Sequence, residues 1–163
     1  MPICPACRGD FPESEAEATH AYMSSSPECW AAYGLILERE YSDPKLFASS
    51  HRLTVDAYAL QHPGDPSERR AVQSFWIHGA SLWMVLRMQR SVAAATGALK
   101  RLAAGEFKER PVEASQFAAT CADLLTSPLE RHHELAKSWA QAALEGWREA
   151  HYEFERLARL AES

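Results

Sequence analysis

The chain has 163 residues, of which 47% are hydrophobic and 24% are charged, and its formal net charge is −5. This length and composition are typical of one globular domain, so we expect residues 1–163 to form a single domain. The negative charge argues against a nucleic-acid partner, because nonspecific binding to phosphates needs many Lys and Arg contacts. No apolar run approaches the ~20 residues of a membrane span, so we expect no membrane association.

The first residues do not have the pattern of an export signal, because the segment from Asp10 to Glu17 is acidic where a signal would be basic and then apolar. We therefore expect a cytoplasmic protein. In that reducing compartment the four cysteines are better candidates for metal ligands or free thiols than for disulfides.

Apolar residues recur at helical spacing along most of the chain, and no segment is rich in the residues of a β-strand. The predicted helices cover about residues 27–41, 50–61, 66–90, 98–104, 115–125 and 128–160. Asp65 and Ser127 are each followed by proline and, three residues on, by glutamate, which predicts a capping box at two of these helix starts. The predicted fold class is all-α, a bundle of four or five helices.

The first 25 residues are polar and lack periodicity, so another interaction must organise them. Cys4-Pro5-Ala6-Cys7 has the spacing of a zinc knuckle, in which the following Gly9 is suited to a positive φ. With His20 and Cys29 it forms C-x2-C-x12-H-x8-C, four ligands that can enclose one Zn²⁺ with no open position. We predict one structural zinc ion and a knuckle of residues 1–29 packed on a helical body of residues 30–163.

Two other interpretations of these cysteines are a redox-active CxxC pair and surface thiols without a role. A redox pair usually begins a helix, whereas Cys7 is followed by Arg-Gly-Asp-Phe-Pro. The spacing up to His20 also matches a DNA-binding zinc finger, but the second half of that pattern is missing and Glu13, Glu15 and Glu17 would repel phosphates.

A second group of polar residues lies on and around the helix predicted at 50–61. Asp56 falls on an apolar helix face and therefore needs a buried partner, for which His78 and His151 are the candidates. We predict a site between helices formed by Asp56, His62, His78 and His151, which would hold a second metal or act in acid–base catalysis. The alternative is a buried polar network that fixes the register of the helices.

Other motifs give weaker indications. His132-His133-Glu134 lacks the second histidine of H-E-x-x-H, so both histidines are expected to be solvated, and Cys121 is expected in the core. The chain has no glycine-rich phosphate loop, nucleophile elbow or dinucleotide fingerprint.

Several segments together carry a resemblance to a known family: Cys4-Pro5-Ala6-Cys7, Thr19-His20, Ser26-Pro27-Glu28-Cys29-Trp30, Arg39-Glu40-Tyr41-Ser42-Asp43-Pro44 and the motif H-x-L-T-V-D-A-Y-x-x-Q-H-P-G at residues 51–64. In these, and in Trp139, Trp147 and His151, the chain resembles a family of small uncharacterised bacterial proteins, a domain of unknown function. The resemblance implies a metal knuckle on a helical body and no mechanism.

Two functional hypotheses follow from the sequence. The first is a non-enzymatic zinc-binding protein, an interaction module in which zinc is structural. The second is a hydrolytic or oxidative metalloenzyme that uses the site between helices. Either would act on an unknown protein or small-molecule partner, and the apolar helix faces suit a monomer or a homodimer.

Overall fold

The computed structural model describes all 163 residues and is built from seven α-helices without a β-strand, which confirms the all-α class. The helices are α1 (Pro27–Ser42), α2 (Pro44–Gln61), α3 (Arg69–Leu82), α4 (Val92–Leu102), α5 (Cys121–Leu125), α6 (His132–Glu145) and α7 (His151–Glu162). A π-helical turn, Trp83–Arg87, extends α3, and short 3-10 turns, Leu129–Arg131 and Arg148–Ala150, precede α6 and α7. The predicted number of four or five helices is therefore too low.

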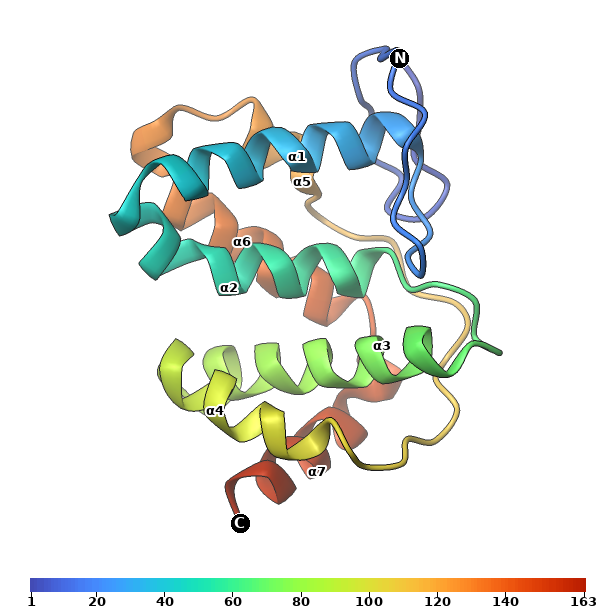
Figure 1. Cartoon of the computed structure of the whole chain (residues 1–163), viewed down its shortest axis with the longest axis vertical. Helices are drawn as coiled ribbons and strands as arrows, with labels where there is room; N and C mark the ends of the chain where they lie inside the picture. Colours follow the sequence, from blue (N-terminus) through green and yellow to red (C-terminus); the bar gives the residue numbers. More distant parts are fainter.

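Helices α1 and α2 form an antiparallel hairpin with almost no connecting loop (Figure 1). Asp43 is at once the C-cap of α1 and the N-cap of α2, and its Oδ1 accepts from the backbone N–H of Lys45. Pro44 then takes the first position of α2, where a missing N–H has no cost. The sequence signal that ends α1 thus also begins α2, six residues before the predicted start.

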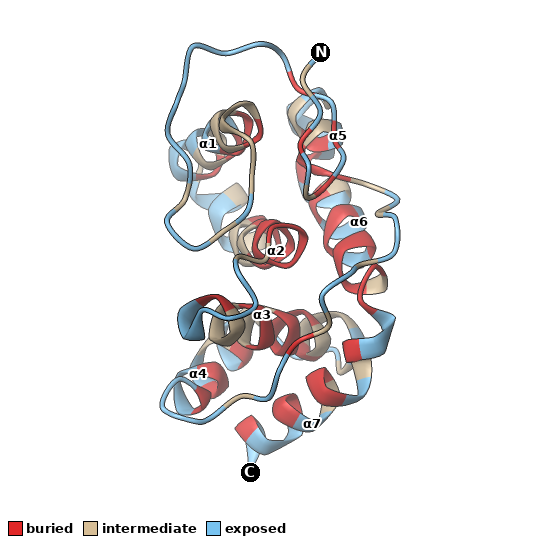
Figure 2. Cartoon of the chain, turned by 90° about the vertical axis from the view of Figure 1, so that its right-hand side faces the viewer, coloured by how far each residue is buried: buried red, intermediate tan, exposed pale blue.

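Helix α2 is the central element of the fold, since it packs against α6, α3 and α1 (Figure 2). Beyond α3, the helices α4 and α7 form the C-terminal end of the molecule, and they contact α3 and each other (Figure 1). The buried apolar side chains make one cluster of 33 residues, which extends from Cys4 in the N-terminal segment to Ala161 in α7. The N-terminal segment is therefore continuous with the main core.

The long helix predicted at 128–160 is interrupted at Gly146. The Phe117 ring occupies the space beside this glycine, so that a Cβ atom there would lie 2.2 Å from the ring. The Gly146 carbonyl accepts a hydrogen bond from the N–H of Ser115, and the chain resumes helical structure only at Arg148. A distant loop thus divides the segment into α6 and α7, a contact that periodicity cannot reveal.

Both predicted capping boxes are also wrong. Asp65 Oδ1 accepts from the backbone N–H and the hydroxyl of Ser67, which makes a local turn, and α3 begins four residues later at Arg69. Ser127 donates its hydroxyl to the Leu124 carbonyl at the end of α5. A capping box does occur at Thr120 and Asp123, at the start of α5. No helix has both the length and the hydropathy that crossing a bilayer requires.

Candidate metal centre

Three cysteines and one histidine meet at the N-terminal end of the α1–α2 hairpin. The ligand atoms of Cys4, Cys7, Cys29 and His62 all lie within 4.8 Å of one another. The Sγ atoms of Cys7 and Cys29 are 4.0 Å apart, and His62 Nε2 is 3.2 Å from Cys29 Sγ. All four residues are buried, with 0–2% of their surface exposed. This set has the composition and compactness of a metal site.

Cys4 and Cys7 lie on a tight backbone turn that the chain closes on itself. The N–H of Cys4 donates to the Gly9 carbonyl (3.0 Å), and the N–H of Arg8 donates to the Cys4 carbonyl (2.9 Å). The Gly9 N–H points to Cys7 Sγ at 3.4 Å, the contact that a thiolate accepts in such turns. The positive φ that the sequence led us to expect at Gly9 belongs to Arg8, whose φ is 66°.

Cys29 occupies the first turn of α1, as predicted. Its backbone N–H donates to the hydroxyl of Ser26, the N-cap residue. Its sulfur receives a contact from the Tyr58 hydroxyl at 3.4 Å, and burial raises the pKa of that hydroxyl, so it remains a donor. Cys29 Sγ also lies 4.0 Å from the sulfur of Cys121, a buried residue of α5. Cys121 is in the core, as predicted, but it borders the candidate metal centre.

His62, at the C-cap of α2, is held in the orientation that metal binding needs. Its Nδ1–H donates to the Tyr58 carbonyl at 2.7 Å, and its ring stacks on the Tyr58 ring with centroids 4.0 Å apart. Because Nδ1 carries the proton, the Nε2 lone pair is free to bind a cation beside Cys29. The His62 carbonyl also accepts from the N–H of Ser24, which fastens the N-terminal segment to the end of α2.

The sequence led us to expect His20 as the fourth member of this set, and the structure places His62 there. His20 lies in the loop before α1, where its Nδ1 accepts from the Tyr22 N–H (3.3 Å) and its ring packs edge-on against Trp30. The signal for His62 was present in the helix lengths. Two antiparallel helices of 16 and 18 residues bring the end of the second beside the start of the first.

The clustered thiols influence one another's ionisation. Hydrogen bonds from Cys29 and Cys7 lower the pKa of the Cys4 thiol. The pKa of Cys7 is raised, first by its hydrogen bond with Cys29, and that of Cys29 is raised, first by its hydrogen bond with Cys121. One thiol therefore ionises easily and the next ones resist. A divalent cation bound at these residues would overcome this resistance because it would stabilise three thiolates together.

The second predicted site is formed only in part. The Nδ1–H of His78 donates to Asp56 at 2.7 Å, and the buried Asp56 carboxylate also accepts from Ser81 and lies 3.3 Å from the Arg52 Nε. His62 belongs to the candidate metal centre, and His151 donates from Nε2 to the Leu144 carbonyl at 2.8 Å. No second group of His, Cys, Asp or Glu side chains has metal-ligand spacing.

A buried network around Glu40 was not predicted. The Glu40 carboxylate accepts from Thr54 (2.7 Å), from His51 Nδ1 (3.1 Å) and from His132 Nε2 (2.9 Å). His132, expected to be solvated, is completely buried, while its neighbour His133 is exposed. Glu40 thereby joins α1, α2 and α6 through buried hydrogen bonds.

Comparison with known proteins places the chain in a family. No curated protein and no solved structure matches it. One family profile matches residues 2–148, a range that includes all four clustered ligands and the whole α1–α2 hairpin. The chain therefore belongs to the family of unknown function DUF5946.

Proposed function

We propose that Cys4, Cys7, Cys29 and His62 bind one Zn²⁺ ion, and that this ion is structural. Three thiolates and one imidazole are a donor set that zinc prefers, and they fill all four positions of a tetrahedral site. A closed and buried site leaves no position for a substrate or a reactive water. The metal would therefore support folding, not chemistry.

The observation that carries this proposal is the state of His62. A buried histidine with a purely structural role would not be expected to direct its unprotonated Nε2 toward a group of cysteine sulfur atoms. The Tyr58 carbonyl nevertheless holds the proton on Nδ1 and leaves Nε2 3.2 Å from Cys29 Sγ. This carbonyl–histidine pairing is the outer-shell arrangement that orients metal-binding histidines in proteins.

Zinc at this position would fasten the polar N-terminal segment to the hairpin. Residues 12–19 are all exposed and contribute no buried apolar side chain, so burial supplies little free energy for ordering this stretch of the segment. The ion would link Cys4 and Cys7 to α1 and α2 and so fix the surface that the knuckle forms. The protein would then be a zinc-stabilised binding module.

Metal analysis of the full chain tests this proposal. We expect one zinc per chain, and after exchange for Co²⁺ the absorption spectrum of a tetrahedral thiolate site. His62→Ala should lose both signals. The matched control is His20→Ala, which should keep one metal per chain. Loss of metal in the His20 variant with retention in the His62 variant would contradict the ligand assignment.

A general-base role for His78 is the second candidate function, and the Asp56–His78 pair favours it. The carboxylate fixes the Nδ1–H tautomer of His78, and Nε2 has no hydrogen-bond partner. His78 lines a shallow depression of about 280 Å³ together with Tyr22, Arg70 and Ser74. The same carboxylate–histidine pairing orients the base in hydrolases.

Hydrolysis of p-nitrophenyl acetate and p-nitrophenyl phosphate tests the second candidate. The wild-type chain should hydrolyse one of them, and His78→Gln should abolish the reaction. His133→Gln, which removes an exposed histidine, serves as the control and should keep the rate. Equal rates in the wild type and the His78 variant would exclude this function.

A further inference from the structure

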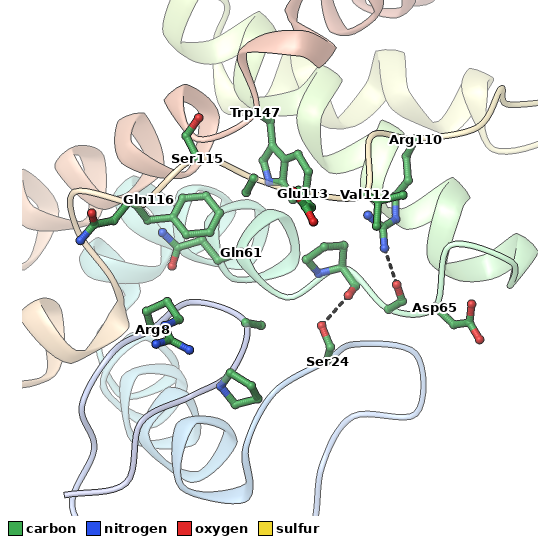
Figure 3. A pocket seen from close by; sticks show the side chains of 16 residues that line it. Arg8, Ser24, Gln61, Asp65, Arg110, Val112, Glu113, Ser115, Gln116 and Trp147 are labelled. Carbon is green, nitrogen blue, oxygen red and sulfur yellow. Dashed lines mark hydrogen bonds between the residues drawn. The ribbon is translucent and has the colours of Figure 1, made fainter.

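A cavity of about 850 Å³ lies beside the metal centre (Figure 3). Its wall comes mainly from three segments, the knuckle, the turn that follows α2 and the irregular loop of residues 110–117, and Ser24 and Trp147 complete it. Pro5 and Ala6, between the two knuckle cysteines, and Gln61 and Pro63, on either side of His62, all line it. The metal ligands thus shape its wall without pointing a donor atom into it.

The turn after α2 is fixed in place around this cavity. Gly64 lies so close to the N-terminal segment that a Cβ atom would be 2.3 Å from the Tyr22 carbonyl oxygen. The Ser24 hydroxyl donates to the Pro63 carbonyl, and the Gly64 carbonyl accepts from Arg110 (2.6 Å), both visible in Figure 3. The cavity is therefore a built feature held by long-range contacts.

Arg110 is a buried cation that interacts at a distance with the Asp65 carboxylate but forms no direct ion pair with it. It is only 7% exposed, lines the cavity and forms no ion pair. Its guanidinium has five N–H groups, and two of its hydrogen bonds go to backbone carbonyls, from Nη1 to Pro111 and from Nη2 to Gly64. Its Nε is buried without any partner. Burying a positive charge is unfavourable unless an anion compensates it. Burial lowers the pKa of Arg110, and the charge of Asp65 offsets this effect only in part.

Arg8 supplies a second cation at the cavity. It is an exposed residue without an ion pair, and its φ of 66° lies in the left-handed region that non-glycine residues seldom adopt. Such outliers persist where the surrounding structure enforces them, and they are common at binding sites. The knuckle turn enforces this one, because the Arg8 N–H is bonded to the Cys4 carbonyl.

Two carboxylates also line the cavity, and they differ in how far they are engaged. Asp65 accepts from the N–H and the hydroxyl of Ser67, and these hydrogen bonds lower its pKa. Glu113 is exposed and makes no side-chain hydrogen bond or ion pair. Glu113 is thus the free negative charge that an anionic ligand would have to tolerate.

We propose that this cavity binds a small organic anion whose carboxylate or phosphate group pairs with Arg110. Apolar side chains in the lining, including Phe117 and Trp147, would contact the non-polar part of the ligand. This binding activity is independent of the metal proposal in its chemistry, although the knuckle forms part of the wall.

The test uses the zinc-loaded full chain and calorimetric titration with four probes. Benzoate and phenyl phosphate carry the anionic groups, while benzyl alcohol and benzylamine are the neutral and cationic controls. We expect saturable binding of at least one of the two anions and of neither control. The preferred anion distinguishes a carboxylate ligand from a phosphate ligand. Amide chemical-shift changes should fall on residues 61–65 and 110–117.

Matched variants decide which side chain is responsible. Arg110→Gln should weaken binding at least about tenfold, because it removes a charge-assisted interaction. Glu113→Gln should strengthen binding. Arg87→Gln, which removes an exposed arginine outside the cavity, should leave it unchanged. Absence of saturable anion binding by the wild type, or equal affinity in the Arg110 variant, would overturn the proposal.

Two measurements keep this result interpretable. Arg110→Gln could fail to fold because its bonds to Pro111 and Gly64 are lost. In that case two other variants decide: Arg8→Gln should weaken anion binding, and Glu113→Gln should strengthen it. An unchanged affinity in both would contradict the proposal. Zinc content is measured in every sample, so that a failure of the metal assignment is distinguished from a failure of ligand binding.

Discussion

Tyr58 holds His62 through its backbone and reaches Cys29 through its side chain. The carbonyl fixes the imidazole proton at 2.7 Å, and the hydroxyl lies 3.4 Å from the sulfur. One residue of α2 thus connects two clustered ligands from different helices. The two contacts can be separated by mutation, because Phe keeps the carbonyl and the ring and removes only the hydroxyl.

Tyr58→Phe should therefore retain one metal per chain and lose about 1 kcal/mol of unfolding free energy. The ring still stacks on His62, so the histidine keeps its orientation. Urea unfolding of the metal-loaded chain measures the loss, and competition with a chelator measures metal affinity. Complete loss of metal would show that the hydroxyl is itself required for binding.

Removing the metal should release the N-terminal segment before the helical body. With a strong chelator, hydrogen exchange of the amides of Cys4, Arg8 and Gly9 should become fast, because their bonds depend on the turn that the metal closes. Amides in α3 and α7, which pack around Phe75 and Phe154, should keep their protection. Uniform protection in both samples would mean that the ion does not organise the knuckle.

Glu40→Ala should destabilise the fold by about 3–5 kcal/mol, because it leaves buried partners without their acceptor. Thr54, His51 and His132 all donate to this carboxylate. Glu38→Ala, an exposed change in the same helix, is the control and should cost less than about 0.5 kcal/mol. Thermal unfolding compares the two. Similar melting temperatures would assign no structural role to the network.

Glu153 should make stability dependent on pH in the acid range. Hydrogen bonds from Arg156 lower its pKa, so its stabilising contribution is present above the unfolded-state pKa and is lost as the pH falls through the folded-state pKa. Glu153→Gln should cost about 1 kcal/mol or less at pH 7 and have little effect at strongly acidic pH. Urea titrations at several pH values test this. A cost that is independent of pH would contradict the assignment.

The sequence predicts the parts of this fold that depend on local chemistry. Ser26 and Pro27 correctly mark the start of α1. The C-x2-C spacing of Cys4 and Cys7 correctly predicts that both belong to one cluster of possible metal ligands. The errors arise where distant segments compete with local signals. Phe117 and Ser115 interrupt a helix at Gly146. The Asp65 side chain, which was expected to cap α3, accepts a hydrogen bond from Ser67 instead.

Three of the four clustered residues, Cys4, Cys7 and Cys29, were expected from the sequence, and the fourth, His62, was missed. The error again arises from a contact between distant segments. His20 is closer in sequence to the knuckle, but His62 is closer in space because the hairpin returns the chain to its starting end (Figure 1). Likewise, Asp56 was expected to need a histidine and has one, whereas the partner of His151 is a backbone carbonyl. Pairing of helices decides such contacts, and a single sequence does not specify it directly.

Because Asp43 caps both α1 and α2, the lengths of the two helices determine whether Cys29 and His62 lie side by side. Insertion of one turn in either helix would displace one ligand by ~5.4 Å along the axis, further than a metal–ligand bond can stretch. During synthesis, moreover, the fourth ligand emerges only with residue 62, after both helices are complete. Metal capture would thus mark the moment at which the N-terminal half of the protein has folded in the correct register.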